Sequence, residues 1–523
     1  MTFRLSPGAG SPFESEALEY SLTQIRGLDE DKRYRYTPRM RFGSSLFILS
    51  ALSFLTGFIQ ADDRPNIIFF FADDQRNTSL GCAGNPVVKT PNVDALAENG
   101  VYFTNSFVNT SVCWVSRGTQ LTGRVARSFS TPTQPDRVKD VALEGIVPDQ
   151  LRSAGYKVGL FGKWHLKFES DFTPEDHYDV FERIWRNPYF HELPDGTKRH
   201  ETQIIGDRAV DFIDGYEGDE PFMLNLWFNA AHAEDGDKRP GIGHFPWPKV
   251  TDGMYEDQEM PLPRLNDPAI FNSQPDFLKQ SINRERFFWR WDTPEKYQTN
   301  MRAYYRMISG VDHVIGRVRE ALEQRGLAKN TIIVYTADNG YYMGDRGFAG
   351  KWSHYEESLR VPLVIYDPRL EKGKRGRKEE RFAVNVDLPA TFLEWAKAEV
   401  PEHYDGHSLV PVLEDRSDIK WREDFLCEHA PLAPLISWEG VRGKRYTYAR
   451  YYDQDDFEFL FDLQSDPDQL KNLAQSSEHE EVLQQMRERT DEYISEYGAP
   501  IAPIAERQGV VRKPKAKGKG KKK

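Results

Sequence analysis

The chain has 523 residues, of which 39% are hydrophobic and 13% aromatic, so it can bury a sizeable core. Its formal net charge of −12 argues against a nucleic-acid-binding protein, because such proteins carry a basic surface. An acidic chain can still bind an anionic substrate where a metal ion or a few cationic side chains dominate the local field. With three cysteines, no complete disulfide framework exists, and Cys82 and Cys427 either pair or stay free.

Residues 1–61 are predicted to be an N-terminal extension and a signal peptide. A short basic segment at Met40-Arg41 precedes an apolar run over 43–59 and a small residue, Ala61. This order is typical of a secretory signal peptide. We predict a start at Met40, cleavage after Ala61 and export to the periplasm or the extracellular space. The alternative is an uncleaved membrane anchor, and membrane contact is expected only through this segment.

Apolar strands alternate with helices through residues 62–415. The run 65–72 is continuously apolar, as in a parallel strand that is buried on both faces. Further strands are predicted over 156–161, 221–228, 331–336 and 361–366, and helices over 90–100, 147–155, 204–216 and 297–325. The alternation predicts an α/β catalytic domain with a large, mostly parallel central sheet flanked by helices. Residues 234–300 are rich in Pro, Gly and Trp and are interpreted as an insertion near the site rather than as core.

Residues 416–505 are predicted to form a smaller C-terminal subdomain. Alternating apolar residues over 440–452 and 459–463 indicate an antiparallel sheet, and 478–497 is amphipathic and helical. Residues 506–523 form a Lys-rich tail that cannot bury a core, so we expect it to be disordered.

Polar side chains follow four of the predicted strands at the point where each strand ends. They are Asp73 and Asp74, Lys163 and His165, His232, and Asp338 and Asn339. Because ligands bind outside the carboxyl ends of strands in open α/β sheets, we expect these side chains to meet. Three carboxylates and one amide are hard ligands that suit Ca²⁺, with Mg²⁺ as the alternative. Each pair alone would indicate an ordinary strand-end turn.

Cys113 begins the segment Cys-Trp-Val-Ser-Arg-Gly-Thr-Gln-Leu-Thr-Gly-Arg over 113–124. A helix is predicted to start at Ser116, and a helix N-terminus attracts anions, as do Arg117 and Arg124. These features favour a nucleophile that acts on an oxyanionic substrate. The competing interpretation is a buried structural cysteine, which is the commoner role of a single Cys.

This segment resembles the signature of the formylglycine-dependent (type I) sulfatases of the alkaline phosphatase superfamily, Cys-x-Pro-Ser-Arg followed after three residues by Leu-Thr-Gly-Arg. It departs from that pattern at Val115, where the family has Pro and sometimes Ala. The resemblance extends over nearly the whole predicted mature chain, through segments at 65–74, 162–165, 338–340, 350–362 and 461–473. It implies a sulfatase, that is, a sulfuric ester hydrolase.

The resemblance also implies how the site works. Cys113 would be converted to formylglycine (3-oxoalanine) by a formylglycine-generating enzyme, and would hold the metal together with Asp73, Asp74, Asp338 and Asn339. Arg117 would steady the modified side chain. Lys163 and Lys351 would bind sulfate oxygens. His165 would act on the second hydroxyl of the aldehyde hydrate, and His232 would help to protonate the leaving alcohol.

The hydrate has a chemical advantage over a plain hydroxyl, whose sulfo-enzyme is hard to hydrolyse, because its second hydroxyl permits release of sulfate. A sulfated carbohydrate is the expected substrate, since export and the tryptophans Trp247, Trp289 and Trp291 suit a sugar polymer. The loop 341–348 resembles that of sulfatases that act on glucosamine-type or uronate polysaccharides. Two alternatives stay open: a phosphoester or phosphonate hydrolase of the same superfamily, and an inactive glycan-binding homologue, for which Val115 is the support.

Overall fold

The structure is a computed structural model that describes residues 63–130, 136–236, 244–429, 436–452, 454 and 457–498. The predicted signal peptide and the predicted basic tail lie outside these residues. The described residues belong to one compact unit. None of the helices within this described part is long and apolar enough to cross a membrane.

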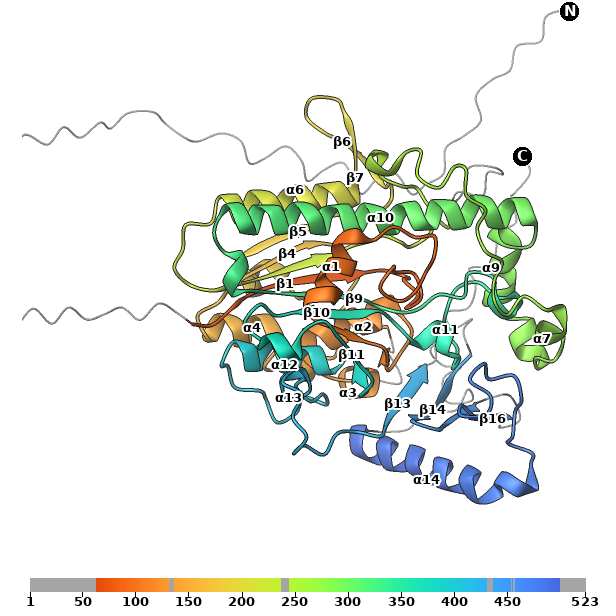
Figure 1. The fold of residues 1–523 in the computed structure, drawn as a ribbon. Coiled ribbons are helices and arrows are strands. Elements are labelled where there is room, and N and C mark those ends of the chain that lie inside the picture. Colours follow the sequence, from red (N-terminus) through yellow and green to blue (C-terminus); the bar gives the residue numbers. More distant parts are fainter. Residues whose placement is uncertain are drawn as a thin grey trace, which may run out of the picture. The chain divides into compact units, whose positions relative to one another are not determined.

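An eight-stranded sheet forms the centre of this unit (Figure 1). Its strand order is β11 (Arg377–Glu379), β2 (Val101–Phe103), β10 (Leu363–Tyr366), β9 (Thr331–Ala337), β1 (Asn66–Ala72), β8 (Phe222–Trp227), β4 (Lys157–Gly162) and β5 (Val180–Arg183). Of the seven neighbouring pairs, five are parallel and two are antiparallel, because β10 runs antiparallel to both β9 and β2. The mostly parallel α/β fold is therefore confirmed.

The central strand β1 shows why a continuous apolar run is needed here. Every residue of β1 is buried, with Ile67 opposite Met223 of β8 and Ile332 of β9. Side chains of alternate residues enter two separate cores, because successive residues of a strand point to opposite faces. One face is covered by α1 (Pro91–Asn99), α6 (Glu201–Asp214) and α10 (Pro294–Gln324), and the other by α2 (Cys113–Thr122), α4 (Val147–Ser153) and α12 (Asp387–Trp395) (Figure 1).

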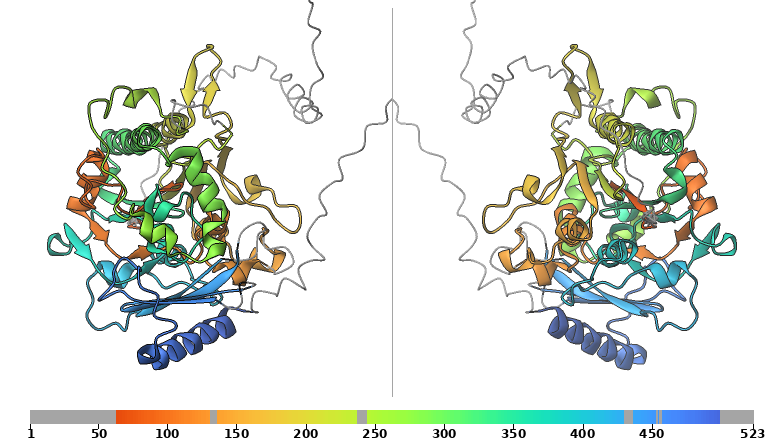
Figure 2. Two further views of the ribbon diagram at one scale, coloured as in Figure 1. Left: turned by 90° about the vertical axis from the view of Figure 1, so that its right-hand side faces the viewer. Right: turned by 90° about the vertical axis from the view of Figure 1, so that its left-hand side faces the viewer.

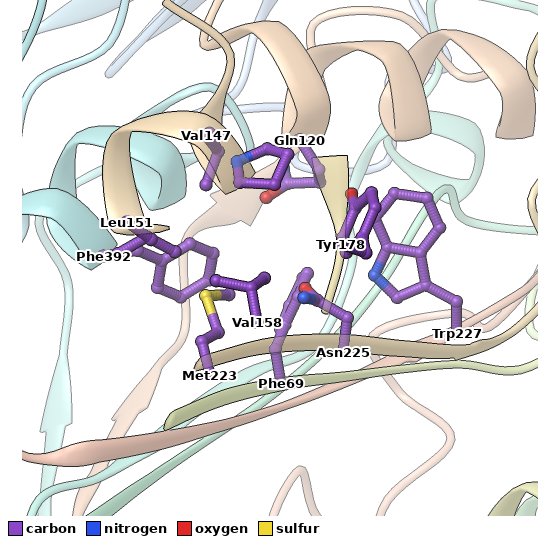
Figure 3. A pocket seen from close by; sticks show the side chains of 11 residues that line it. Phe69, Gln120, Val147, Leu151, Val158, Tyr178, Met223, Asn225, Trp227 and Phe392 are labelled. Carbon is purple, nitrogen blue, oxygen red and sulfur yellow. The ribbon is translucent and has the colours of Figure 1, made fainter. Parts of the chain in front are cut away.

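A small pocket of about 10 Å³ lies in the core, between the strands of the sheet and α2, α4 and α12 (Figure 3). Apolar side chains such as Met223 and Phe392 face it, and two of its polar side chains are hydrogen-bonded to the backbone. Asn225 donates to the Gly159 carbonyl at 3.0 Å, and Gln120 donates to the Asn385 carbonyl at 2.8 Å. A space of this volume holds no more than about one water molecule. It is a packing feature of the core and not a substrate site.

The interpretation of residues 234–300 as lying outside the core is wrong in part. This segment forms α7 (Pro268–Asn272), α8 (Asp276–Lys279), α9 (Ile282–Arg290) and the start of α10. Phe245, Tyr255, Met260 and Trp291 are buried in the same cluster as the middle of α10. The long α10 exposes an apolar side that the sheet alone does not cover, so this segment must cover it. Trp291 therefore packs in the core and offers no ring to a sugar.

The C-terminal part has the predicted antiparallel sheet and helix (Figure 2). Its strands follow one another in the order β13 (Asp424–His429), β14 (Trp438–Gly443), β15 (Tyr446–Tyr451) and β16 (Phe457–Asp462), and α14 (Glu480–Tyr497) covers the outer face. The inner face packs Trp438 and Phe459 against Tyr355 of the catalytic part. The domain boundaries at residues 415 and 505 stay predictions. Cys82 and Cys427 are free cysteines.

Shorter elements complete the described part of the chain: β3 (Ser106–Phe107), β12 (Ala383–Val384), β6 (Phe190–Glu192), β7 (Lys198–His200), α3 (Ala126–Phe129), α5 (Pro174–His177), α11 (Glu356–Leu359) and α13 (Val410–Leu413).

A substitution at Gly162, the last residue of β4, tests how tightly the strand ends are packed. It has φ +122°, and a Cβ added there would lie 2.0 Å from the Trp227 carbonyl oxygen. We expect Gly162→Ala to lower the free energy of unfolding by roughly 2–4 kcal/mol, through steric overlap and the left-handed backbone together. Chemical denaturation monitored by fluorescence measures this change.

Gly196→Ala is the matched control, because Gly196 also has positive φ (+78°) but an added Cβ meets nothing within 4 Å. Its cost should be about 1 kcal/mol. Equal losses for the two variants would contradict the steric argument.

Candidate active site

The predicted polar residues do meet at the carboxyl edge of the sheet. Backbone hydrogen bonds continue beyond the strand ends and hold the following segments together: Asp338 N donates to Ala72 O at 3.0 Å, and Lys163 N donates to Trp227 O at 2.7 Å. Asp74 takes φ +54°, so the chain leaves β1 in a sharp turn with both carboxylates buried. Parallel pairing therefore brings together residues that lie up to 265 positions apart.

Two lysines pair with the two carboxylates that follow β1. Lys163 Nζ forms an ion pair with Asp73, and Lys351 Nζ forms one with Asp74. Burial by itself would raise the pKa of Asp73 and Asp74, but the Lys163 and Lys351 ammonium groups, respectively, hold both below the usual range. By contrast, burial and the Asp73 carboxylate raise the pKa of Asp338 well above its usual value. Three carboxylates this close leave the site short of positive charge.

The donor atoms of this cluster fit a hard divalent cation. Asp73 Oδ1, Asp74 Oδ2 and Asn339 Oδ1 are buried and accept no hydrogen bond from the described residues. Leaving a buried acceptor unpaired costs on the order of 1–3 kcal/mol, so these oxygens require a partner. Asp73, Asp74 and His232 offer ligand atoms within 4.8 Å of one another. Carboxylate and amide oxygens are ligands of Ca²⁺ and Mg²⁺.

Asp338 and Asn339 join this group through hydrogen bonds. Asp338 Oδ1 accepts from the Asp74 amide at 3.2 Å, and Asn339 Nδ2 donates to Asp74 Oδ1 at 2.6 Å. The Asn339 amide nitrogen thus faces a carboxylate, and its oxygen is left free for another partner. All four predicted metal ligands from the strand ends therefore lie in one buried cluster.

Cys113 stands at the beginning of α2, and the predicted helix start at Ser116 is corrected by three residues. The Ser116 amide already donates to the Val112 carbonyl at 3.0 Å, so Val112 caps the helix and Cys113 is its first residue. Cys113 Sγ lies 3.3 Å from His165 Nδ1. The nucleophile candidate therefore sits at the positive end of the helix dipole, beside a histidine.

Arg117 connects α2 to the other strand ends. Its side chain is fully buried, and its guanidinium donates to Asp338 Oδ2 at 2.8 Å and to the Lys163 carbonyl at 3.2 Å. A third bond reaches the Phe228 carbonyl at 3.2 Å. Arg117 thereby fixes the first turn of α2 against three different strands.

The two histidines differ in exposure but both carry a neutral imidazole. Desolvation by the walls of the site and then the Lys163 ammonium lower the pKa of His165, although its side chain reaches the surface. His232 is buried, and burial followed by the charge of Arg186 lowers its pKa well below the usual value. His232 Nδ1 lies 2.7 Å from the Ala233 carbonyl, which assigns the proton to Nδ1. Its Nε2 faces Asp74 Oδ2 at 3.7 Å.

Arg186 is a site residue that the sequence patterns did not reveal. It follows β5, a short edge strand that had not been predicted because its four residues are only partly buried or exposed. Arg186 donates to the Ala233 carbonyl at 2.7 Å and places a positive charge next to His232. The only feature of the sequence that could have indicated Arg186 is its position as a polar residue after a further strand of the sheet.

Comparison with known proteins agrees with this geometry. The family model described as "Sulfatase" matches residues 65–398, and "N-sulphoglucosamine sulphohydrolase, C-terminal" matches residues 344–496. The chain is 28% identical to an N-acetylglucosamine-6-O-sulfatase of Bacteroides thetaiotaomicron (83% of this chain, 87% of that protein) and 27% identical to an arylsulfatase of Clostridium perfringens (81% and 93%).

Two solved structures have a similar fold. One is a protein in complex with its substrate D-glucosamine-2-N,6-O-disulfate (TM-score 0.68, 25% identity, covering 83% of this chain and 98% of that one). The other is a phosphonate monoester hydrolase of Agrobacterium radiobacter (TM-score 0.67, 23% identity, 83% and 96%), a likeness of fold alone. Since the family model covers more than half of the sequence, the chain belongs to the sulfatase family of the alkaline phosphatase superfamily and is a sulfuric ester hydrolase.

Proposed function

We propose that this protein removes sulfate esters from sulfated carbohydrates, with residue 113 as formylglycine and with Ca²⁺ as the metal ion. The observation that carries the proposal is the position of Cys113, within 3.3 Å of His165 and at the edge of a buried cluster with three unpaired oxygens and two lysines. The names of relatives support the carbohydrate class, since they include an N-acetylglucosamine-6-O-sulfatase and an ulvan-active sulfatase.

The residues that would hold the metal ion are Asp73, Asp74, Asp338, Asn339 and the modified side chain at position 113. A bound divalent cation supplies Lewis-acid stabilisation of sulfate charge. Formylglycine, made by a formylglycine-generating enzyme, supplies a hydrate nucleophile in place of the thiol. Three carboxylates against the cations Lys163, Lys351 and Arg117 balance to zero, so a divalent ion gives the site the net positive charge that an anionic ester requires.

Four side chains of the protein then act on the ester. Lys163 and Lys351 neutralise the sulfate oxygens in a water-poor site, where such charges have a large effect. His165, within reach of position 113 and with a lowered pKa, would accept the proton of the second hydroxyl of the hydrate, which permits release of sulfate. His232 directs Nε2 at the site, and the negative charge of a bound sulfate raises its proton affinity. His232 can then take up a proton from solvent at Nε2 and give it to the leaving alcohol.

The two alternatives have less support. The likeness to phosphonate monoester hydrolases concerns the fold, whereas the Cys113 signature and the two lysines favour sulfate. Val115, the departure from the signature, is 3% exposed and packs in the core with Leu121 and Phe129. Its side chain therefore does not enter the site, so any effect of Val115 on activity would act through the conversion of Cys113 to formylglycine.

We also propose that the protein is exported to the periplasm or the extracellular space. A relative named as an extracellular sulfatase homologue of Drosophila melanogaster is 26% identical over 70% of this chain. The predicted signal peptide gives the route, and its cleavage after Ala61 would expose a new N-terminus just before the first described residue. N-terminal sequencing of the secreted protein tests this assignment.

Replacement of Cys113 tests the nucleophile. The full chain is expressed with a formylglycine-generating enzyme, and sulfate release is measured from an aryl sulfate and from sulfated glucosamines. We expect Cys113→Ala to lower kcat/KM by roughly 10⁴-fold or more, because no other side chain can form the hydrate. Cys82→Ala, at a half-buried free cysteine, should keep wild-type activity. Mass spectrometry should find an aldehyde at position 113 of the wild type.

An active wild type that keeps an unmodified thiol at position 113 would contradict the formylglycine proposal. An aldehyde without any sulfate release would favour the phosphonate alternative, which an aryl phosphonate ester then tests.

Metal removal tests the oxygen cluster independently of activity. Chelation followed by Ca²⁺ at about 100 times its Kd should stabilise the fold by about 2.7 kcal/mol, since the ion binds only the folded chain. Thermal unfolding with Ca²⁺ and with Mg²⁺ measures the effect and identifies the preferred ion. Asp73→Asn should abolish the shift, whereas Asp276→Asn, an exposed carboxylate on α8, should retain it. A shift that survives Asp73→Asn would place the ion elsewhere.

A further inference from the structure

Helix α9 is attached to the loop that carries Lys351. In Figure 1 it stands beyond the end of the sheet toward which β1 runs. The Asn283 side chain of α9 donates to the Lys351 carbonyl at 2.7 Å, and the Asn283 carbonyl accepts from the Ala349 amide at 2.9 Å. The position of α9 is therefore coupled to that of the lysine that pairs with Asp74.

Two arginines on α9 share one carboxylate. Arg286 Nη2 lies 3.1 Å from Asp235 Oδ2, and Arg290, one turn later on the same helix face, pairs with the other oxygen of Asp235. Asp235 itself follows His232 by three residues. Two guanidinium groups against one carboxylate leave an excess of one positive charge beside the proposed active site.

These arginines also have N–H groups without a hydrogen-bond acceptor among the described residues. Within the described part of the chain, Arg286 Nε, Arg290 Nε, Arg290 Nη1 and the Tyr341 hydroxyl are buried without an acceptor. Charged donors without acceptors are costly, and they are satisfied best by an anion. The Arg290 side chain is fully buried, but that of Arg286 is 16% exposed, so only Arg286 of the two can be reached by a ligand.

The surroundings place Arg286 against the loop that carries Lys351. Its guanidinium lies 4.8 Å from the ring of Trp352, the residue that follows Lys351. Burial raises the pKa of the buried Tyr341 hydroxyl, and the nearby charges of Arg290 and Arg286 oppose this rise. A ligand that extends from the lysines toward α9 would meet Arg286.

We propose that Arg286 binds a second anionic group of the substrate, a sulfate or a carboxylate on the same or the next sugar, and that Asp235 and Arg290 hold its guanidinium in position. The planar fork of arginine matches both anions. This inference rests on the proposed sulfatase function and narrows it to polyanionic saccharides, as opposed to sugars with a single sulfate.

Binding to the full chain carrying Cys113→Ala tests the inference without turnover. Calorimetry with Ca²⁺ present compares three probes: a monosulfated glucosamine, the same sugar with two sulfates, and a monosulfated disaccharide with one uronate. We expect the disulfated or the uronate probe to bind at least 10-fold more tightly than the monosulfated one, and the better probe identifies the second anion. Adding Arg286→Gln should reduce that preference by about 10- to 100-fold, as for one charged hydrogen-bonded contact.

Arg208→Gln, at a surface arginine of α6 paired with Glu182, is the matched control and should keep the preference. Arg286→Lys should restore part of it, because charge remains but the fork is lost. Misfolding would weaken all three probes alike and leave their ratio unchanged. Equal binding of the three probes, or a preference that survives Arg286→Gln, would overturn the inference. Absence of sulfate release by the wild type would instead refute the proposed function. The ratio of binding affinities is measured without turnover, so the two failures can be told apart.

Discussion

The burial of three carboxylates at the carboxyl edge of one sheet is the constraint on which the rest of this structure depends. Asp73, Asp74 and Asp338 lie at the ends of adjacent strands, none more than 1% exposed. Carboxylates so close and so dry repel one another and raise each other's pKa unless cations join them. Two lysines and one arginine balance the three carboxylates, and the unpaired oxygens on Asp73, Asp74 and Asn339 mark the place where a further cation would find ligands.

The same constraint explains the rigidity around the site. Arg117 is fully buried because it must reach Asp338 and two backbone carbonyls at once, which ties α2 to the sheet. Position 113 is thereby held at the start of α2, facing His165. Gly162 has no side chain because the Trp227 carbonyl lies where a Cβ would be, and this close approach sets the direction in which Lys163 leaves β4. Catalytic geometry and core packing are therefore set by the same contacts.

Further cationic side chains lie around this centre. Arg186 stands beside His232, and Arg286 and Arg290 pair with Asp235, which follows His232 by three residues. A chain with net charge −12 thus concentrates cationic side chains at one edge of its sheet. Such a local field attracts anionic substrates even though the overall surface would repel them. This arrangement links the sulfate chemistry at the centre to recognition at the rim.

Sequence by itself determined the α/β class and most strands and helices, and it predicted that the four strand-end residues proposed as metal ligands would lie together. Apolar runs that end in polar residues are a local signal, and the Cys113 signature is contiguous, so both can be read along the chain. The start of α2, the burial of Trp291, the edge strand before Arg186 and the pairing of Arg286 with Asp235 were decided only by the tertiary structure. Each depends on which segments pack together over long sequence separations, because a residue's burial and charge partners come from the fold and not from its neighbours in the chain.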